Sequence, residues 1–406
     1  MSDMTLRVRG LDTLLFRDGR PFGAEAGARA DTLPVPMPST LAGFLRTLAG
    51  YARGCASAAE WADLSASVAI RGPLLCREDE PILPAPADVL VPRRGGGGDD
   101  GGAIGDPIPL RPWSAAALGQ AGTDIPGGMR PMRITADAKP ARGYGHWTWA
   151  NVERWLRGDL PGTADLVPDL APLVDERVHI QMDHERGAAA EHALFSTRMV
   201  AFERREADEH GAPTVEYSLL CRAAGLTKAD VARGAGTLGG ESRLALVAGA
   251  EPDAWPRCPA ELARAVAGAR RVRLLLATPA VFTHGWKPGW IDRTTREGAP
   301  PGPNGKPLGV RLRLVAAAVP RRQPLSGWDL THGGPKPLRY CAPAGAVYFF
   351  EKVDGDAACL ATEGEEGGWL APVSDLEETS VPGRRRANNR DDGFGLALWG
   401  AWNEEE

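Results

Sequence analysis

Short apolar, strand-like segments recur from one end of the chain to the other, and this pattern constrains the fold most strongly. We expect strands near residues 5–16, 67–76, 177–182, 194–203, 215–221, 244–247, 272–277, 310–319, 346–353 and 394–402. Helices are expected only near 41–53, 147–156, 227–233 and 259–269. A chain of 406 residues is long enough for two or three domains. We predict an α+β fold with two ferredoxin-like (RRM-like) domains, at 1–250 and 251–406, carrying long loop insertions.

A short amphipathic helix is predicted after residue 38. Four apolar residues follow the spacing of one buried helical face: Leu41, Phe44, Leu45 and Leu48. Ser39 or Thr40 can cap the start of this helix, and Gly50 and Gly54 allow its end.

The loop at 17–38, before this helix, is long for a compact domain, and such loops are usually functional or disordered. It carries Arg17, Arg20 and Arg29 among several glycines, so guanidinium groups and bare backbone amides can face one ligand together. Phosphate is the natural ligand for that combination. The alternative is a mobile surface loop with solvated arginines.

A second glycine-rich turn precedes the strand at 244–247. Gly239 and Gly240 come shortly before Arg243, so the backbone can approach a phosphate while the guanidinium binds it. Gly-Gly turns before strands are common, and the motif alone is therefore weak.

The residues at 393–396 partly match the first RNA-recognition-motif signature. Gly393 and Gly395 flank an aromatic residue, but Asp392 and Leu396 stand where the signature needs a basic and an aromatic residue. A tight glycine loop packed on a sheet is therefore favoured over a base-stacking platform. The basic run just upstream, at 384–390, is expected to be a solvated face. The insertions at 92–107 and 298–307 are expected to be disordered and flexible, respectively.

Metal and cofactor sites are not expected. His179, Asp183, His184 and His192 lie close in sequence, but Asp183 precedes His184, the reverse of a His-Asp metallohydrolase pair. The six cysteines show no paired spacing, which argues against both a zinc site and a disulfide framework. His284, beside Gly285, is better placed to contact RNA by a hydrogen bond or by stacking, although a half-buried structural histidine explains it equally well.

Net charge and hydropathy exclude two classes of protein. A net charge of −5 argues against a chain that coats nucleic acid non-specifically, although a local basic groove remains compatible with it. No apolar run approaches the roughly 18 residues of a membrane span, and no leader sequence opens the chain. We therefore expect a cytoplasmic protein without membrane contact.

The order of several motifs resembles one protein family. They are DTLLFRDGRPF at 12–22, PSTLAG at 38–43, IRGP at 70–73, LF at 194–195, LGGESR at 238–243, GPKP at 334–337, PAG at 343–345 and GFGL at 393–396. Together they are similar to the Cmr-complex RAMP subunit of type III-B CRISPR effectors. The resemblance implies a subunit without catalytic activity that binds the 5′ handle of the guide RNA (crRNA). It implies the large polymerase-like subunit and the backbone RAMP subunits as partners, and it extends RNA contact to Ser39, Thr40, Trp286, Lys287 and Lys336.

Two other functions remain open from the sequence. One is a RAMP endoribonuclease that processes the guide precursor with a histidine as general acid or base, but residues 41–53, where such a histidine is expected, contain none. The other is the equivalent subunit of a type III-A complex. The sequence does not decide against that second alternative.

Overall fold

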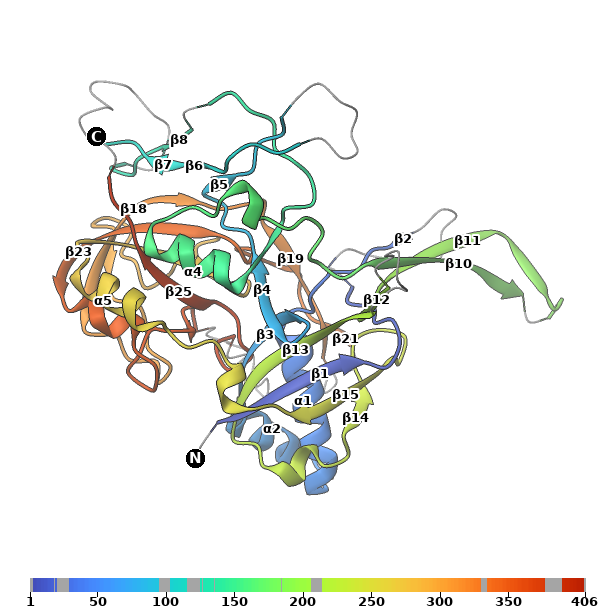
Figure 1. Cartoon of the computed structure of the whole chain (residues 1–406). Coiled ribbons are helices and arrows are strands. Elements are labelled where there is room, and N and C mark those ends of the chain that lie inside the picture. The colour runs from blue at the N-terminus through green and yellow to red at the C-terminus, as the bar shows by residue number, and fades with distance from the viewer. Residues whose placement is uncertain are drawn as a thin grey trace. The chain divides into compact units, whose positions relative to one another are not determined.

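The computed structural model describes residues 3–17, 19, 29–94, 103–114, 125, 127–134, 136–183, 185–205, 214–329, 334–376 and 389–404. Within them the chain forms mostly antiparallel sheets with few helices (Figure 1), which confirms the expected mixed α/β class. Arg20, His184, Asn388 and the arginines at 384–386 lie outside the described residues.

The chain divides into two compact units, each built from separated stretches of sequence. Unit 1 comprises Met1–Asp79, Ala171–Trp255 and Pro324–Tyr340, and unit 2 comprises Glu80–Leu170, Pro256–Gln323 and Cys341–Glu406. The predicted boundary at 250/251 lies near Trp255, where the chain passes from unit 1 to unit 2. The segment 80–170, however, belongs to the second unit and not to the first. The reason is packing at Gly400, where an added Cβ would lie 2.4 Å from the carbonyl oxygen of Leu156. The glycine thus lets a helix of the segment 80–170 touch a strand from the end of the chain.

Unit 1 is built on an antiparallel sheet whose strands follow the order β14-β15-β1-β13-β3. Its strands are β1 (Met4–Gly10), β3 (Ala69–Arg77), β13 (Thr214–Ala224), β14 (Ala235–Thr237) and β15 (Leu244–Gly249), and β12 (Glu203–Arg205) pairs with β13. The hairpin β10 (Val174–Asp183) and β11 (Ala188–Val200) carries the short parallel strand β2 (Arg29–Ala30), while β20 (Trp328–Asp329) pairs with β21 (Gly334–Pro335). The inward side chains of β1, Leu6 and Val8, are fully buried.

Helix α1 (Pro38–Arg53) closes the core of unit 1, as the apolar periodicity predicted. Leu41, Phe44, Leu45 and Leu48 are all buried. Gly54 ends the helix at φ 70°, a left-handed conformation that glycine adopts without strain. The predicted start was wrong. Met37 is the N-cap residue and makes no side-chain cap, because Pro38 occupies the first helical position, where its fixed φ and missing N–H cost nothing.

Three shorter elements complete unit 1. Helix α2 (Ala58–Ser67), which the sequence reading missed, begins with a capping box between Ser57 and Glu60. The predicted helix at 227–233 is the 3₁₀ turn η2 (Lys228–Val231), and η3 (Pro252–Ala254) follows β15. Gly72 lies at a register irregularity within the single strand β3, which confirms the strand expected near 67–76.

Asp230 ties the end of α1 to the turn η2, and its replacement by asparagine should weaken the fold. The guanidinium of Arg53 donates to both carboxylate oxygens at 2.8 Å and, as the largest cause, lowers the pKa of Asp230 to about 2. Because this folded pKa lies below the unfolded one, the contribution is present above pH 4 and is lost as the pH falls toward 2. Asp230→Asn should cost about 1–2 kcal/mol at pH 7 and much less near pH 2.

Urea unfolding of both proteins at the two pH values tests this expectation. Asp63→Asn, on the exposed face of α2, is the matched control and should change stability by less than about 0.5 kcal/mol. A loss for Asp230→Asn that is equally large at low pH would contradict the ion-pair account.

Unit 2 is built on a second antiparallel sheet, with the order β17-β18-β23-β16-β25-β24. Its strands are β16 (Arg271–Leu276), β17 (Glu297–Gly298), β18 (Val310–Ala318), β23 (Val347–Gly355), β24 (Ala371–Pro372) and β25 (Leu396–Ala401). Helix α5 (Ala260–Gly268) precedes β16, and the 3₁₀ turn η4 (Ala357–Ala361) follows β23. Aromatic side chains fill the core: Phe349, Phe350 and Trp399 are completely buried.

The segment 80–170 adds a helix and short hairpins to unit 2. Helix α4 (Trp149–Arg157) is capped by Thr148 at its start and by Gly158 at its end, and its last residue lies one position beyond the predicted range of 147–156. The short strands are β4 (Glu80–Pro84), paired with β9 (His146–Thr148), then β5 (Val89–Leu90) with β6 (Ile108–Pro109), and β7 (Arg111–Pro112) with β8 (Met132–Arg133); η1 (Thr163–Asp165) follows α4. Two further strands, β19 (Gln323–Leu325) and β22 (Arg339–Cys341), lie where the chain crosses between the units.

Beneath α4 lies a completely buried ion pair. A guanidinium nitrogen of Arg273 is 3.5 Å from the carboxylate of Asp88, and both residues are 0% exposed. The same guanidinium lies 3.6 Å above the ring of Trp155, and Arg111 approaches Asp88 to 3.3 Å. Burial raises the pKa of Asp88 and lowers that of Arg273 despite their attraction. Desolvation therefore exceeds the Coulombic gain in this pair.

Two loop predictions are corrected by this fold. Residues 298–307 form a hydrogen-bonded turn instead of a flexible linker, with Pro301 bridging Pro307. The predicted disorder at 92–107 falls partly on 95–102, outside the described residues, whereas the flanking residues Arg93 and Ile104 pair with each other.

Candidate nucleic-acid interface

In unit 1 the segment 12–19 brings together parts of the chain that are distant in sequence. The backbone N–H of Leu14 donates to Val200 at the end of β11, and that of Gly240 donates to the carbonyl of Leu15 at 2.8 Å. Arg17 is exposed and forms a backbone bridge with Thr32. The first arginine loop and the Gly239–Gly240 turn are therefore neighbours, which the sequence did not predict.

Lys336 belongs to the same neighbourhood. A Cβ on Gly19 would lie 2.9 Å from the side chain of Leu338 and 3.3 Å from the backbone nitrogen of Ser326. The hydroxyl of Ser326 donates to the carbonyl of Lys336 at 3.0 Å, and Lys336 itself is exposed. Segment 12–19 thus contacts the stretch that presents this lysine.

The two glycines of the second turn have different structural roles. Gly239 adopts φ +81°, and an added Cβ would lie 2.4 Å from the carbonyl of Leu15, so only glycine fits there. Gly240 has an ordinary φ, and its added Cβ would meet only the side chain of Leu15, at 3.2 Å. Glu241 and Ser242 follow in left-handed conformations that are uncommon for such residues. Gly239 therefore shapes the turn, whereas at Gly240 an added Cβ would press only on a side chain that can shift.

Arg243 forms an ion pair with Asp12. Its guanidinium donates to Asp12 at 2.7 Å, and Arg177 lies 3.8 Å from the same carboxylate. The backbone N–H of Thr13 is the largest cause that lowers the pKa of Asp12, and the two arginines add to it. A phosphate at this turn would have to share Arg243 with Asp12.

Ser39 and Thr40 lie half-buried in the first turn of α1. Neither side chain caps the helix, and the backbone N–H of Thr40 donates to the carbonyl of Met37 at 2.8 Å. The positive end of the helix dipole is therefore presented there without a side-chain cap.

In unit 2 His284, Trp286 and Lys287 share one tight loop. His284 bridges Lys287 across Gly285, which has φ +76°. The buried hydroxyl of Tyr348 donates to the carbonyl of Trp286 at 2.7 Å and holds the loop on β23. Partial burial lowers the pKa of Lys287, whose ammonium donates to the carbonyl of Asp292 at 3.1 Å. His284 is exposed, whereas Trp286 and Lys287 are half-buried.

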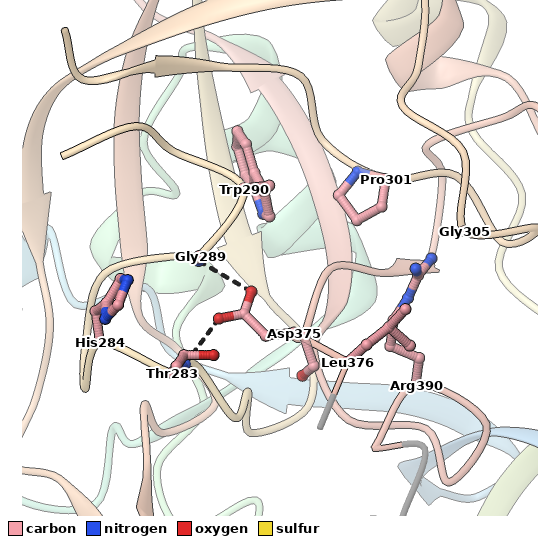
Figure 2. A pocket seen from close by; sticks show the side chains of 10 residues that line it. Thr283, His284, Gly289, Trp290, Pro301, Gly305, Asp375, Leu376 and Arg390 are labelled. Carbon is pink, nitrogen blue, oxygen red and sulfur yellow. Dashed lines mark hydrogen bonds between the residues drawn. The ribbon is translucent and has the colours of Figure 1, made fainter. Parts of the chain in front are cut away.

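Beside this loop lies a hollow of about 330 Å³, around which Figure 2 shows His284, Trp290, Asp375 and Arg390. The carboxylate of Asp375 accepts hydrogen bonds from the backbone N–H groups of Thr283 and Gly289, at 2.7 and 2.9 Å. Asp375 thus fixes both ends of the loop at 283–289. The sequence did not identify it, because its partners lie some 90 positions away.

Arg390 and Trp290 were also missed. The basic run at 384–390 was expected to be solvated, but Arg390 is 5% exposed and donates to the carbonyls of Pro372 and Gly302, which corrects that prediction for this residue. Trp290 stacks on Phe350 with centroids 5.6 Å apart. The only sequence signal for this hollow was the presence of Trp290 six positions after His284.

Gly393 and Gly395 are buried, which confirms the glycine loop packed on a sheet. Gly395 has φ +80°, donates to the carbonyl of Pro279, and would bring an added Cβ to 2.6 Å from the hydroxyl of Ser374. Phe394 between them is 1% exposed, so its ring offers no surface to a base.

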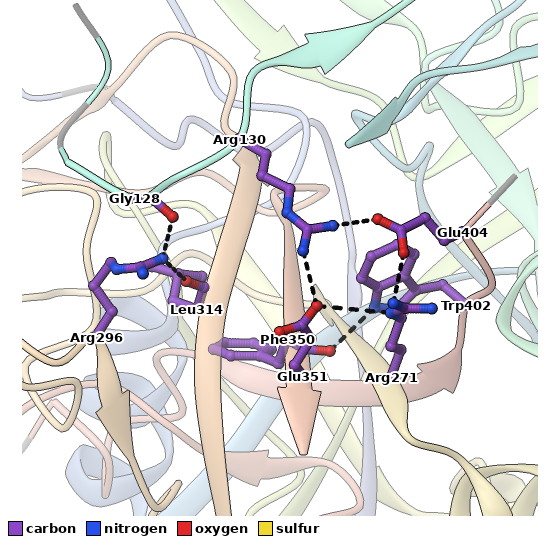
Figure 3. A network of polar contacts seen from close by, with 9 residues as sticks. All are labelled: Gly128, Arg130, Arg271, Arg296, Leu314, Phe350, Glu351, Trp402 and Glu404. Carbon is purple, nitrogen blue, oxygen red and sulfur yellow. Dashed lines mark hydrogen bonds and ion pairs between the residues drawn. The ribbon is translucent and has the colours of Figure 1, made fainter. Parts of the chain in front are cut away.

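A further group of charged residues is engaged within unit 2. In Figure 3 the guanidinium groups of Arg130 and Arg271 lie between the carboxylates of Glu351 and Glu404. This alternation of two cations and two anions leaves little net charge for phosphate. Glu404 is thus a partner of two internal arginines, while residues 405 and 406 lie outside the described part of the chain.

Among the described residues there is no cluster of three or more histidine, cysteine, aspartate or glutamate side chains that could hold a metal ion. His179 stacks on Phe195 and shares a hydrogen bond with Thr197 at 2.8 Å. All six cysteines are free thiols, and three of them are buried: Cys76, Cys221 and Cys341. In the same described ranges no helix is both long and apolar enough to cross a bilayer.

Comparisons with known proteins give consistent results. The family described as "CRISPR-associated protein (Cas_Cmr3)" matches residues 6–402. No curated protein matches the chain. Among solved structures, "Cryo-EM structure of the Type III-B Cmr-beta bound to cognate target RNA and AMPPnP, state 1" is similar with 13% identity and a TM-score of 0.45, covering 85% of this chain and 86% of that chain. "Crystal structure of Csm3-Csm4 subcomplex in the type III-A CRISPR-Cas interference complex" gives 7% identity and a TM-score of 0.37, covering 99% and 100%.

The family match begins within β1 and ends just after β25, so it spans both units. It includes the segment 12–19, the turn at 239–243 and the glycine loop at 393–395. The chain therefore belongs to the CRISPR-associated Cas_Cmr3 family, the RAMP-type Cmr subunits that its motif order resembled.

Proposed function

We propose that this protein is a non-catalytic RNA-binding subunit of a type III-B CRISPR effector complex, acting in the cytoplasm. It holds the 5′ handle of the guide RNA and joins the large polymerase-like subunit to the backbone RAMP subunits. The observation that carries the proposal is the gathering of Arg17, the Gly239–Gly240 turn and Lys336 around segment 12–19. Exposed cations beside a glycine turn suit a phosphodiester chain.

The strand orders support a ferredoxin-like core in each unit. Numbered by their place in the chain, the four main strands of unit 1 (β1, β3, β13, β15) follow the spatial order 4-1-3-2, and those of unit 2 (β16, β18, β23, β25) follow the same order read backwards. This is the order that a split β-α-β arrangement produces. Unit 2 has no helix between β16 and β18, where the 282–292 loop stands instead.

In unit 2 we propose that the loop at 284–287 supplies a base contact. His284 is exposed at a hollow of about 330 Å³, a size within the usual range for small-ligand sites. An imidazole edge can hydrogen-bond or stack on a splayed base. Gly393 and Gly395, which are buried, would act by supporting this loop and not by touching RNA.

Replacing Arg17 and Arg20 together with alanine tests the phosphate contact. We expect weaker binding of a guide RNA that carries the 5′ handle and a salt dependence flattened by about 0.7 units of slope for each phosphate lost. Stability should change by less than about 0.5 kcal/mol per exposed arginine. Filter binding at several salt concentrations measures both quantities. Arg233→Ala, an exposed arginine after η2, is the control, and an unchanged slope in the double variant would refute the contact.

Gly240→Ala and Arg243→Ala test the second turn. Because the added Cβ meets only the Leu15 side chain, Gly240→Ala should leave the melting temperature nearly unchanged while it blocks RNA approach and weakens binding. Arg243→Ala should weaken binding less, because Arg243 already shares its charge with Asp12. Thermal midpoints and guide-RNA affinities separate the effects. Intact affinity in both variants would remove the turn from the interface.

The absence of catalytic activity is tested directly. The pure protein is incubated with labelled guide precursor, with and without magnesium or manganese. We expect no specific cleavage. Cleavage that disappears in His284→Ala or His184→Ala would instead establish a processing endoribonuclease.

A further inference from the structure

An acidic side chain lies at the proposed phosphate contact of unit 1. The side chain of Asp12 is 54% exposed, and Arg243 donates to its carboxylate at 2.7 Å. Asp12 belongs to the segment 12–19, to which the turn of Arg243 is joined by the hydrogen bond from Gly240 to Leu15. A phosphate held by Arg243 would therefore lie beside the negative charge of Asp12.

The carboxylate of Asp12 is ionised and fixed in place, yet it keeps free acceptor positions. The backbone N–H of Thr13 donates to one of its oxygens at 2.7 Å and, as the largest cause, lowers the pKa of Asp12. Arg243 donates to the other oxygen, and Arg177 lies 3.8 Å from the first. Both oxygens of an ionised carboxylate can accept more than one hydrogen bond, so lone pairs of this exposed group remain for a ligand.

A phosphate alone is a poor ligand for this arrangement. Its charge is repelled by Asp12, and the guanidinium that attracts it is shared with the same carboxylate. Arg243 still has donors to offer, because a guanidinium carries several N–H groups and the hydrogen bond to Asp12 uses one of them. A ligand that also brought a hydroxyl group to Asp12 would offset the repulsion with a charge-assisted hydrogen bond.

Ribose carries such a hydroxyl next to a phosphate. In RNA the 2′-hydroxyl is bonded to the carbon beside the one that carries the 3′-phosphate, and DNA lacks this group. An RNA phosphate on Arg243 would thus bring a hydrogen-bond donor toward Asp12, whereas a DNA phosphate would bring only its charge.

We propose that Asp12 selects ribose over deoxyribose at this turn by accepting a hydrogen bond from a 2′-hydroxyl of the bound strand. Selection of this kind depends on repulsion of the wrong ligand as well as on attraction of the right one. The inference rests on the proposed function for RNA binding at this turn, and it adds which sugar the turn accepts.

A bridging metal ion is the other means of placing a carboxylate beside a phosphate. Magnesium commonly joins one or two carboxylates to the phosphates of a ligand. At Asp12, however, two guanidinium groups already lie 2.7 and 3.8 Å from the carboxylate, and their charge opposes a further cation. In the described part of the chain, no three potential metal-binding side chains form a cluster here or elsewhere.

Asp12→Ala and Asp12→Asn test this selection in the full-length chain. Asp12→Asn keeps an acceptor for the N–H of Thr13 and so preserves the local fold. The probes are three single-stranded oligonucleotides with the sequence of the 5′ handle: RNA, DNA, and RNA with methylated 2′-hydroxyl groups, which cannot donate. Filter binding with magnesium and with EDTA measures each affinity, and thermal midpoints confirm folding. Asp253→Ala, which removes an exposed carboxylate of η3 in the same unit, is the matched control.

We expect the wild-type chain to bind RNA at least about tenfold more tightly than DNA or methylated RNA, as one charge-assisted hydrogen bond allows. Asp12→Ala should narrow the RNA-to-DNA ratio about tenfold, because RNA loses its hydrogen bond whereas DNA loses only the repulsion. Asp12→Asn should narrow the ratio about threefold, since the amide oxygen still accepts from the 2′-hydroxyl. Asp253→Ala should leave the ratio within about twofold.

Three results would overturn the inference. An unchanged ratio in both Asp12 variants would show that Asp12 does no more than position Arg243. Equal affinity of the wild-type chain for RNA and methylated RNA would show that no 2′-hydroxyl donates to the carboxylate. A preference for RNA that EDTA abolishes would assign Asp12 to a bridging metal ion. Failure of the proposed function is distinct: a wild-type chain that binds none of the three strands would refute that function, and this inference with it.

Discussion

Replacing Asp88 with alanine is expected to lower the free energy of unfolding by about 3–5 kcal/mol, since it leaves Arg273 charged in a site closed to water. The guanidinium would keep only the face of Trp155, 3.6 Å away, as a favourable contact. No surface side chain can replace the carboxylate, because Asp88 and Arg273 are both 0% exposed. Guanidinium denaturation at pH 7.5, followed by circular dichroism, measures the loss.

Two comparisons distinguish the pair from ordinary ion pairs. Combining Asp88→Ala with Arg273→Leu removes both charges, and it should recover most of the lost stability, because desolvation outweighs attraction in this site. Arg94→Ala removes one partner of an exposed pair with Asp106 and should cost less than about 1 kcal/mol. A double variant that is as unstable as Asp88→Ala would refute the account.

The same pair predicts a pH dependence. Burial, the largest cause, raises the pKa of Asp88 to about 6, although Arg273 and Arg111 both oppose it. An unfolded aspartate titrates near pH 4, so between about pH 4 and 6 the folded state holds a proton that the unfolded state has released. Stability contributed by this group therefore falls as the pH rises through that window. Asp88→Asn should remove that part of the slope.

Gly395→Ala is expected to destabilise unit 2 by about 2–5 kcal/mol without changing RNA affinity per folded molecule. The residue has φ +80°, and the new Cβ would lie 2.6 Å from the hydroxyl of Ser374, which accepts a hydrogen bond from Val281. Strain at the glycine would thus displace the backbone that supports the 282–292 loop. Thermal unfolding and filter binding on the same samples measure the two effects.

Gly268→Ala is the control for this variant. Gly268 ends α5, and no atom lies within 4 Å of its added Cβ. Alanine there should be neutral or stabilise by up to about 1 kcal/mol. Lost RNA affinity in Gly395→Ala at full stability would mean that the glycine contacts RNA, as the partial RNA-recognition-motif signature first suggested.

Local patterns in the sequence were sufficient for most elements. The apolar periodicity from Leu41 to Leu48 located α1, and the helix expected at 147–156 matches α4 to within two residues at each end. These signals work because helix faces and caps involve residues three or four positions apart. The same local chemistry was present but overlooked at α2, where Ser57 and Glu60 have the spacing of a capping box.

The sequence by itself determined the helices α1, α4 and α5, most of the longer strands, the mixed α/β class and the family, because each depends on near neighbours or on motif order. Only the tertiary structure decided which of these residues meet: Leu15 with Gly240, and Thr283 with Asp375. It also decided that Arg273 and Arg390 are buried, since an arginine in a sequence carries no mark of the carboxylate or carbonyls that will surround it. Contacts between residues 90 or more positions apart leave no periodic pattern in the sequence. Such contacts assemble the proposed interface.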